Sequence, residues 1–563
     1  MALRLAEEGK RVCVLERGRK YPPGSFARTP QELRSNFWRP ARGTYGLFDV
    51  WSFRHIAAIV AAGVGGGSLI YANVLIRKDE RWFFTDGLAC KAQPWPVTRK
   101  ELDPYYDAVE KVLKPQIFPD RYVPNSKTQF MREAAVRMGI SETNYDEGDP
   151  AKPQWYRPQL AVTFANRCSE PQPGVVIDDG EWNLHNKPRE TCRLCGECDV
   201  GCNFGSKNTL DYTYLSKALL TGNAALYDLC EVESIQIERR NGHTAYRIGF
   251  VQHYPLMQRK SECRYVYAER LVVACGTMGS TLLLLRNRRN LPGLSRNKNL
   301  GSRFSGNGDY LAFARFVKRR NPRGRREFVD LRASRSPVIT STFRFPDAHD
   351  TANGVRGHYV QDAGYPVIAD YVWELLSPVR LFRRAARFAG KLLLKWFTGG
   401  GATEIGGQLR ALVGDARGSS SSMPLLGMGR DTPNGRMRLN LRRRLTVSWK
   451  STRSQPYFSH VDASAKRIAK NLGGVYAQNP VTSLFNTLIT VHPLGGCPMG
   501  RSAQDGVVDQ FGRVFGCPGL WVADGSVMPG PVGANPSMTI AALAERFADR
   551  MVSQWNLQNW PDT

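Results

Sequence analysis

The stretch from Thr490 to Arg546 constrains the fold more than any other, because glycines and prolines bend it repeatedly before it ends in a helical pattern. Glycine lets a backbone turn sharply and approach a ligand closely. Two polar residues, His492 and Asn535, stand here in apolar surroundings, one in a His-Pro-Leu-Gly-Gly run and one in a Gly-Ala-Asn-Pro run. A lone histidine of this kind is usually a hydrogen-bonded core residue. The pairing of the two runs instead indicates a ligand site.

Composition sets the broad class of the protein. The 563 residues are 42% hydrophobic and 23% charged, as in a globular protein with two or three structural units. The formal net charge of +28 favours an anionic partner, either nucleic acid or an anionic membrane surface. No nucleic-acid-binding module is recognisable. No apolar run is long enough to span a bilayer, and the first residues do not form a secretory signal. We therefore expect a cytoplasmic protein, with peripheral membrane contact as an option.

The amino-terminal residues are typical of the second half of a dinucleotide-binding unit. Residues 1–9 are expected to end a helix at Gly9, and residues 11–15 form an apolar strand followed by Glu16. In such units an acid at this place binds the ribose hydroxyls; an ordinary strand-end acid is the alternative. The preceding strand and G-x-G-x-x-G turn are not present in the sequence. We expect the native start to lie upstream, because without that turn cofactor affinity should suffer.

A second glycine-rich segment, AAGVGGGSLIYANVLI, covers residues 61–76. Gly65, Gly66 and Gly67 would let the backbone approach a phosphate or a ring, and Ser68 can cap the next turn of the chain. Taken alone, the triplet is equally compatible with a flexible turn.

Four cysteines form the sharpest local pattern, CRLCGECDVGC, with ferredoxin-like C-x2-C-x2-C-x3-C spacing. Thiolates this close together repel one another unless a metal compensates their charge. Asn203 replaces the usual proline, and no second cysteine set exists. One iron–sulfur cluster, a zinc knot and reduced structural thiols remain as alternatives. The candidate metal ligands are Cys192, Cys195, Cys198 and Cys202.

Together, the motifs HPLGG, VADGS, GANP, GVGGGSLxYAN and GSKNTLDYTYL resemble those of the glucose-methanol-choline (GMC) flavin oxidoreductases, in their cholesterol oxidase-like branch. The resemblance implies that His492 and Asn535 face the flavin and the substrate hydroxyl, and that Asn73 lies near the isoalloxazine ring. It also implies FAD as the cofactor. The implied cofactor-binding residues are Glu16, Gly65, Gly66, Gly67, Ser68, Asn73, Val232, Gly276, Asp524, Gly525, Asn535, Pro536, Ser537, Met538 and Thr539.

The predicted fold class is α/β, with two units. A discontinuous Rossmann-type FAD-binding domain, lacking its amino-terminal βα turn, would comprise residues 1–114, 190–310 and 485–563. A substrate domain with a large, mainly antiparallel sheet would comprise residues 115–189, predicted to be irregular, and 311–484. Within it, residues 377–397 form a basic amphipathic helix. That helix could lie in a membrane interface or pack on the sheet as a surface helix.

Oxidation of an alcohol requires removal of a proton and a hydride, and the flavin takes the hydride. An imidazole such as His492 suits the proton, and the amide of Asn535 can bind the oxygen without adding charge. The resemblance implies a sterol or another bulky hydrophobic alcohol as substrate. The alternatives are a sugar or polyol dehydrogenase, and a catalytically inactive flavoprotein-like protein at a membrane surface. Oxygen, a quinone and a cytochrome remain open as electron acceptors.

Overall fold

The computed structural model describes residues 1–85, 93–144, 147–166, 169–178, 180–240, 243–255, 261–321, 323–329, 331, 336–347, 356–364, 421–479, 482 and 487–555. The basic helix predicted at residues 377–397 lies outside these ranges. Within them, no helix combines the length and the apolar character needed to cross a membrane.

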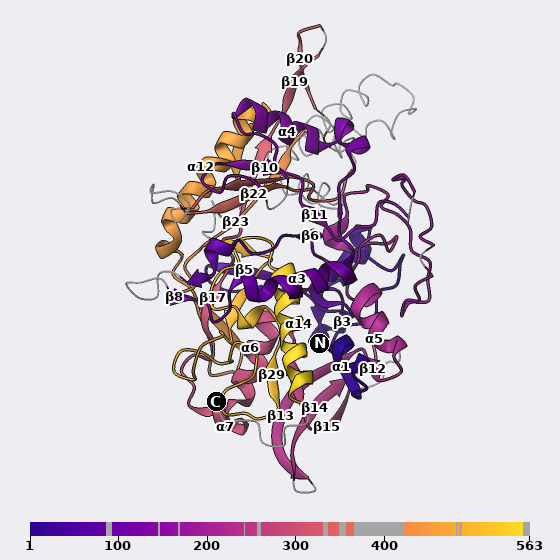
Figure 1. The fold of residues 1–563 in the computed structure, drawn as a ribbon, viewed down its shortest axis with the longest axis vertical. Coiled ribbons are helices and arrows are strands. Elements are labelled where there is room, and N and C mark those ends of the chain that lie inside the picture. The colour runs from indigo at the N-terminus through magenta and orange to yellow at the C-terminus, as the bar shows by residue number, and fades with distance from the viewer. Residues whose placement is uncertain are drawn as a thin grey trace, which may run out of the picture.

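Short parallel strand pairs lie in the lower half of the molecule, which also contains the antiparallel strands β13 (Cys230–Arg240), β14 (His243–Gln252) and β15 (Glu262–Ala268) (Figure 1). Strand β1 (Val12–Leu15) pairs with β12 (Ala224–Tyr227), and β16 (Leu271–Val273) pairs with β29 (Leu520–Val522). Helix α1 (Ala2–Glu7) precedes β1, and α6 (Gly276–Asn287) follows β16. The predicted helix and strand at the amino terminus are thus confirmed. In open α/β sheets, ligands bind at the carboxyl ends of such strands.

A further parallel pair joins two glycine-rich segments. Strand β5 (Ile56–Ala61) lies between β4 (Phe48–Ser52) and β27 (Leu488–Thr490), with Ala58 opposite Thr490. The two segments that follow β5 and β27 therefore start side by side, although more than 400 positions separate them in the sequence.

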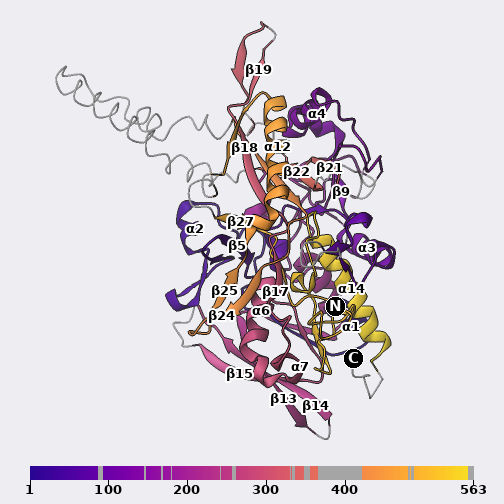
Figure 2. The ribbon, with the colours of Figure 1, turned by 90° about the vertical axis from the view of Figure 1, so that its left-hand side faces the viewer.

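A six-stranded sheet occupies the upper half of the molecule, and every pairing in it is antiparallel (Figures 1 and 2). Helix α12 (Gln455–Leu472) packs against four of its strands, and α4 (Lys127–Arg137) packs against α12 and β22. The predicted large antiparallel sheet is confirmed. Its strands, in spatial order, are β10 (Gln154–Tyr156), β21 (Thr342–Phe345), β22 (His358–Asp362), β23 (Met423–Gly429), β18 (Tyr310–Arg315) and β26 (Val475–Gln478).

The prediction of irregular structure for residues 115–189 was wrong for α4. Its buried positions include small or polar residues such as Ala134, Ala135 and Thr128, so its amphipathic pattern is weak. Helix α3 (Arg99–Leu113) starts at a capping box between Thr98 and Glu101.

One hydrophobic cluster holds the two halves together, since it contains Val273 and Val522 of the lower strands as well as Phe343 and Val360 of the sheet. The carboxyl-terminal helix α14 (Ser537–Ser553) packs on α3. The remaining helices and strands are α2 (Pro30–Ser35), β2 (Trp38–Arg39), β3 (Thr44–Tyr45), β6 (Val74–Leu75), β7 (Phe84–Thr85), β8 (Gln93–Pro94), β9 (Gln116–Ile117), β11 (Gln159–Leu160), α5 (Ser216–Leu220), α7 (Pro292–Ser295), β17 (Ser302–Ser305), β19 (Lys318–Arg320), β20 (Arg326–Phe328), β24 (Arg436–Leu439), β25 (Leu445–Ser448) and β28 (Leu494–Gly496).

Candidate active site

His492 lies just after β27 and is held by a buried carboxylate. Its Nδ1 is 2.7 Å from Oδ1 of Asp309, whose side chain is only 3% exposed. Oδ2 of Asp309 accepts hydrogen bonds from Thr490 Oγ1 at 2.9 Å and from the backbone N–H groups of Val491 and His492 at 2.8 and 3.1 Å. A carboxylate at Nδ1 favours the tautomer in which Nε2 is the acceptor. Among the residues whose structure is described, none forms a hydrogen bond with Nε2.

The turn that carries Asp309 also contacts the segment that contains Asn535, through Asn307. Asn307 is fully buried, with a left-handed φ of 54°. Its Nδ2 donates to the carbonyl of Ala534 at 2.8 Å, and its Oδ1 accepts the N–H of Gly533 at 2.9 Å. Asn535 follows directly. One short turn thus connects the His492 segment to the Asn535 segment.

A second carboxylate, Asp431, supports the same turn from beneath. Its two oxygens accept Ser305 Oγ at 2.5 Å and the N–H of Gly306 at 3.0 Å. Burial raises the pKa of Asp431 to about 6, and the nearby charge of Asp309 acts in the same direction. Sequence analysis did not identify Asp309 or Asp431. The signal for Asp309 was the Ser-Gly-Asn-Gly-Asp run that leads into β18.

The first glycine-rich segment presents an open backbone surface. Gly65 and Gly66 have φ values of 113° and 56°, and a Cβ on Gly66 or Gly67 would meet no heavy atom within 4 Å. Ser68 Oγ donates to the Gly65 carbonyl at 2.7 Å and so closes the turn. Asn73 has a φ of 68° and is fully buried, yet neither atom of its amide has a partner among the described residues.

Glu16, Gly276 and Asp524 lie at the carboxyl ends of β1, β16 and β29. Glu16 accepts the N–H of Gly18 at 2.7 Å, and desolvation raises its pKa to about 7. Desolvation and then the charges of Asp524 and Glu16 raise the pKa of the Cys275 thiol to about 12, which places both carboxyl groups near Cys275. A Cβ on Gly276 would point into open space, but its φ of 73° favours glycine.

Asp524 is buried and organises the residues beside it. It accepts the Ser280 hydroxyl and, at 2.8 Å, the N–H of Ser526. Burial raises the pKa of Asp524. The hydroxyls of Thr277 and Ser526 are buried without a partner among the described residues. Gly525 has little room for a side chain, because an added Cβ would lie 3.0 Å from Thr277 Oγ1.

The residues at the start of α14 that were predicted to contact the cofactor are mostly buried. Pro536 is the N-cap of the helix, and Ser537 Oγ lies 3.3 Å from the Val74 carbonyl. Met538 and Thr539 are fully buried, and Thr539 Oγ1 bonds the Tyr106 hydroxyl at 2.9 Å. A ligand could therefore reach Met538 and Thr539 through their backbone only. Val232, one of the implied cofactor-binding residues, lies on β13, opposite Phe250 of β14.

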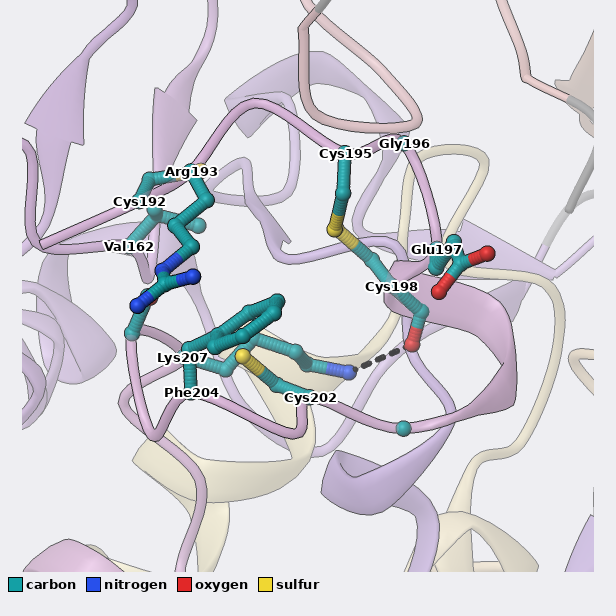
Figure 3. A pocket seen from close by; sticks show the side chains of 12 residues that line it. Val162, Cys192, Arg193, Cys195, Gly196, Glu197, Cys198, Cys202, Phe204 and Lys207 are labelled. Atoms are coloured by element: carbon teal, nitrogen blue, oxygen red, sulfur yellow. Dashed lines mark hydrogen bonds between the residues drawn. The ribbon is translucent and has the colours of Figure 1, made fainter. Parts of the chain in front are cut away.

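The four clustered cysteines line one pocket together with Phe204 and Lys207 (Figure 3). Burial raises the pKa of Cys192 and Cys198, and raises that of Cys195 to about 12, so these thiols stay protonated at neutral pH. The described residues include no group of three or more His, Cys, Asp or Glu side chains that could hold a metal ion. The predicted metal site at Cys192, Cys195, Cys198 and Cys202 is therefore unsupported.

Lys207 helps to fix the cysteine loop. Its buried ammonium donates to three carbonyls, those of Leu69 at 3.1 Å, Tyr71 at 2.9 Å and Cys198 at 2.9 Å. Figure 3 shows the last of these bonds. The lysine thereby joins the cysteine loop to the first glycine-rich segment.

Comparisons with known proteins agree on one family. Family models described as GMC oxidoreductase match residues 179–305 and 462–544. A cholesterol oxidase of Mycobacterium tuberculosis is 30% identical over 561 residues, covering 97% of this chain and 88% of that protein. A cholesterol oxidase of Acinetobacter baumannii is 27% identical, covering 99% and 93%. The crystal structure of pyridoxine 4-oxidase from Mesorbium loti matches with a TM-score of 0.57 and 17% identity, covering 98% and 96%.

Proposed function

This chain belongs to the GMC oxidoreductase family, FAD-dependent enzymes that act on CH–OH donors, and we propose that its substrate is a sterol or another bulky hydrophobic alcohol. The observation that carries the proposed mechanism is the pair His492 and Asp309, linked through one turn to Asn535. The alcohol would be oxidised to a carbonyl.

The residues at the strand ends fit FAD. The unpaired Asn73 amide and the unpaired hydroxyls of Thr277 and Ser526 need partners that a flavin ring, ribitol and pyrophosphate would supply. The open backbone at Gly66 and Gly67 leaves room for close approach. We propose that Glu16 binds the adenosine ribose and that Val232 lies by the adenine. The segments 65–68, 276–277 and 524–526 and the start of α14 would bind the rest.

FAD, when bound, accepts the hydride from the carbinol carbon. The protein binds the alcohol oxygen and removes its proton. His492 Nε2 accepts the hydroxyl proton, and Asp309 stabilises the resulting imidazolium. The amide of Asn535 donates to the same oxygen and holds the carbinol carbon in place. Asp309 performs no proton transfer itself: it fixes the ring and the tautomer.

Two features support a hydrophobic substrate. Apolar residues pack around Ala534, which directly precedes Asn535: Trp82, Ile339 and Tyr359 belong to the same buried cluster. A sugar or polyol would instead require several polar partners. The relatives named cholesterol oxidase, and a long-chain-alcohol oxidase of Arabidopsis thaliana that is 25% identical over 454 residues, are named for such alcohols.

We propose oxygen as the electron acceptor. The named relatives are oxidases, and the cysteine pocket gives no support to a cluster that would pass electrons onward. Iron analysis of anaerobically purified protein tests whether a cluster is present, because one iron–sulfur cluster would add iron and a broad visible absorbance. A quinone or cytochrome acceptor would leave oxygen consumption negligible.

Activity on a panel of alcohols tests the substrate proposal. Oxygen uptake and peroxide formation should be matched, and should be highest with 3-hydroxysterols and lower with long-chain alcohols and sugars. His492→Ala should lower turnover by about 10²- to 10⁴-fold while the protein keeps its yellow colour. Wild-type turnover in His492→Ala would refute the role of His492, and a preference for sugars would refute the substrate class.

A further inference from the structure

Gln361 is a buried amide on β22 that points toward the candidate site. Side chains alternate along a strand, so Gln361 and Tyr359 share one face and Asp362 lies on the other. Asp362 accepts the N–H groups of Thr340 and Ser341 at 3.0 and 2.7 Å, and pairs with Lys127 at 2.9 Å. These bonds fix the end of β22 on its far face and leave Gln361 directed at residues 534–535.

The Gln361 amide contacts Asn535 directly. Its Nε2 donates to Asn535 Oδ1 at 2.9 Å and to Thr342 Oγ1 at 3.1 Å. Gln361 is fully buried, and its Oε1 has no partner among the residues described. Both hydrogens of Nε2 are therefore used, and the side chain is held between two acceptors.

This contact decides which end of the Asn535 amide is available. With Oδ1 engaged by Gln361, the amide presents Nδ2, a donor, to its remaining surroundings. No described residue accepts a hydrogen bond from that Nδ2. The opposite orientation would place Oδ1, a second acceptor, against an alcohol oxygen that is losing its proton, and the two oxygens would repel each other.

We infer that Gln361 is a positioning residue that orients the Asn535 amide so that Nδ2 donates to the alcohol oxygen as negative charge develops on it. The inference rests on the proposed function of His492 and Asn535. It adds a third side chain to the alcohol-binding arrangement, supplied by the six-stranded sheet instead of by the cofactor-binding segments.

Gln361→Glu provides the sharpest test, because a carboxylate only accepts hydrogen bonds whereas a carboxylic acid can also donate one. Ionised Glu would draw Asn535 Nδ2 toward itself and turn Oδ1 to the substrate. We expect the variant-to-wild-type ratio of kcat to fall on the order of 10²-fold at high pH. The ratio should recover as pH falls through the pKa of the introduced acid. Using the ratio removes the pH dependence that His492 gives to both proteins.

The matched control is Gln154→Glu on β10 of the same sheet. Gln154 Nε2 donates to the Asp149 carbonyl at 2.7 Å and does not take part in the candidate site. Its kcat ratio to wild type should not change with pH. Gln361→Met, which has similar length but cannot donate, should lower kcat at every pH with no recovery. It keeps the inference testable if Gln361→Glu does not fold.

A pH-independent ratio for Gln361→Glu, or wild-type kcat in Gln361→Met, would overturn the inference. Failure of the proposed function is recognised separately, because His492→Ala would then retain activity. The flavin absorbance of each variant reports whether FAD binding is intact. A purely structural role for Gln361 would lower stability and flavin content without a pH-dependent kcat ratio.

Discussion

Two buried carboxylates on neighbouring segments differ because their partners differ. Asp309 holds an imidazole through one oxygen and accepts two backbone N–H groups and a hydroxyl through the other. Asp431 bonds Ser305 and Gly306 within the turn, and its pKa is raised by burial. In the proposed mechanism the first carboxylate orients His492, and the second maintains the turn that carries Asp309.

Asp309→Asn is expected to lower the rate of flavin reduction by about 10²- to 10⁴-fold, as for other His–Asp pairs, because Nδ1 loses the carboxylate that sets the tautomer. Rapid-mixing absorbance measurements under anaerobic conditions give this rate. The matched control is Asp505→Asn, in a surface turn where Asp505 accepts the N–H of Ser502. Equal rates for Asp309→Asn and wild type would contradict the role of Asp309.

Asp431 should make stability depend on pH. Its pKa is raised to about 6 in the folded protein from an ordinary 3.8, so the folded state binds the proton more tightly than the unfolded state. The resulting stabilisation is fully present below about pH 4, and is lost as pH rises through about 6; its size is about 3 kcal/mol. The free energy of unfolding of wild type minus that of Asp431→Asn should therefore be larger at pH 4 than at pH 7.5.

Chemical denaturation of both proteins at the two pH values measures this difference. The comparison of wild type with Asp431→Asn removes the contributions of other acids, such as Asp199, which titrate identically in both. A stability difference that does not change between pH 4 and pH 7.5 would show that Asp431 has an ordinary pKa in the folded protein.

At this scale the sequence led to His492 and Asn535 as candidate site residues but did not indicate the residues that contact them. Glycine- and proline-rich surroundings and family motifs drew attention to the two polar side chains. Their partners Asp309 and Gln361 lie 183 and 174 positions away, in a glycine-containing turn and in a strand. Only the fold brings such residues together.

Among the elements, the short turn at residues 65–69 provides the clearest test of where the cofactor binds. A Cβ on Gly67 would meet no protein atom within 4 Å, and Gly67 does not have a left-handed φ. Gly67→Ala should therefore leave the stability of the cofactor-free protein within about 0.5 kcal/mol. Because FAD is proposed to lie over this backbone, the methyl group should weaken FAD affinity by at least about 10-fold.

Fluorescence titration of cofactor-free protein with FAD gives this affinity, and thermal unfolding without FAD provides the internal control. Unchanged affinity would place the cofactor elsewhere. A large loss of stability without FAD would mean that the added methyl group clashes with the protein itself.

Elements with strong patterns were predictable. The strand at residues 11–15, helix α3 and the hairpin of β24 and β25 follow from apolar alternation, capping residues and turn residues. Helix α4 was missed because several of its buried residues are small or polar, which weakens its amphipathic pattern. The cysteine spacing left an iron–sulfur cluster, a zinc knot and reduced thiols as alternatives, and it could not predict that Lys207 holds that loop through backbone carbonyls.

At the scale of the whole molecule, the proposed cofactor site is assembled from distant parts of the chain. The segments near residues 16 and 65 contact each other through the Arg19–Gly63 bridge, and those near residues 276 and 524 follow the paired strands β16 and β29. The antiparallel sheet was predictable from alternation, but the strand order β10–β21–β22–β23–β18–β26 was not. That order depends on long-range packing, which local pattern does not encode.

FAD should stabilise the whole molecule, because it would contact all of these segments at once. At a free concentration of 100 times its Kd, the stabilisation is about 2.7 kcal/mol, which should raise the unfolding temperature by a few degrees. Differential scanning calorimetry across an FAD titration measures the shift. ADP should give a smaller shift through the adenine and ribose contacts alone. An unfolding temperature that does not depend on FAD concentration would argue against this assembled site.

The central claim is that His492, set by Asp309, removes the hydroxyl proton while the carbinol hydrogen leaves as hydride. The most direct measurement is the anaerobic rate of flavin bleaching by a sterol carrying deuterium on its carbinol carbon, compared with the unlabelled sterol. We predict a slower rate with deuterium in wild type, and a rate lowered by orders of magnitude in His492→Ala with FAD still bound. Bleaching at the wild-type rate in His492→Ala would contradict the claim.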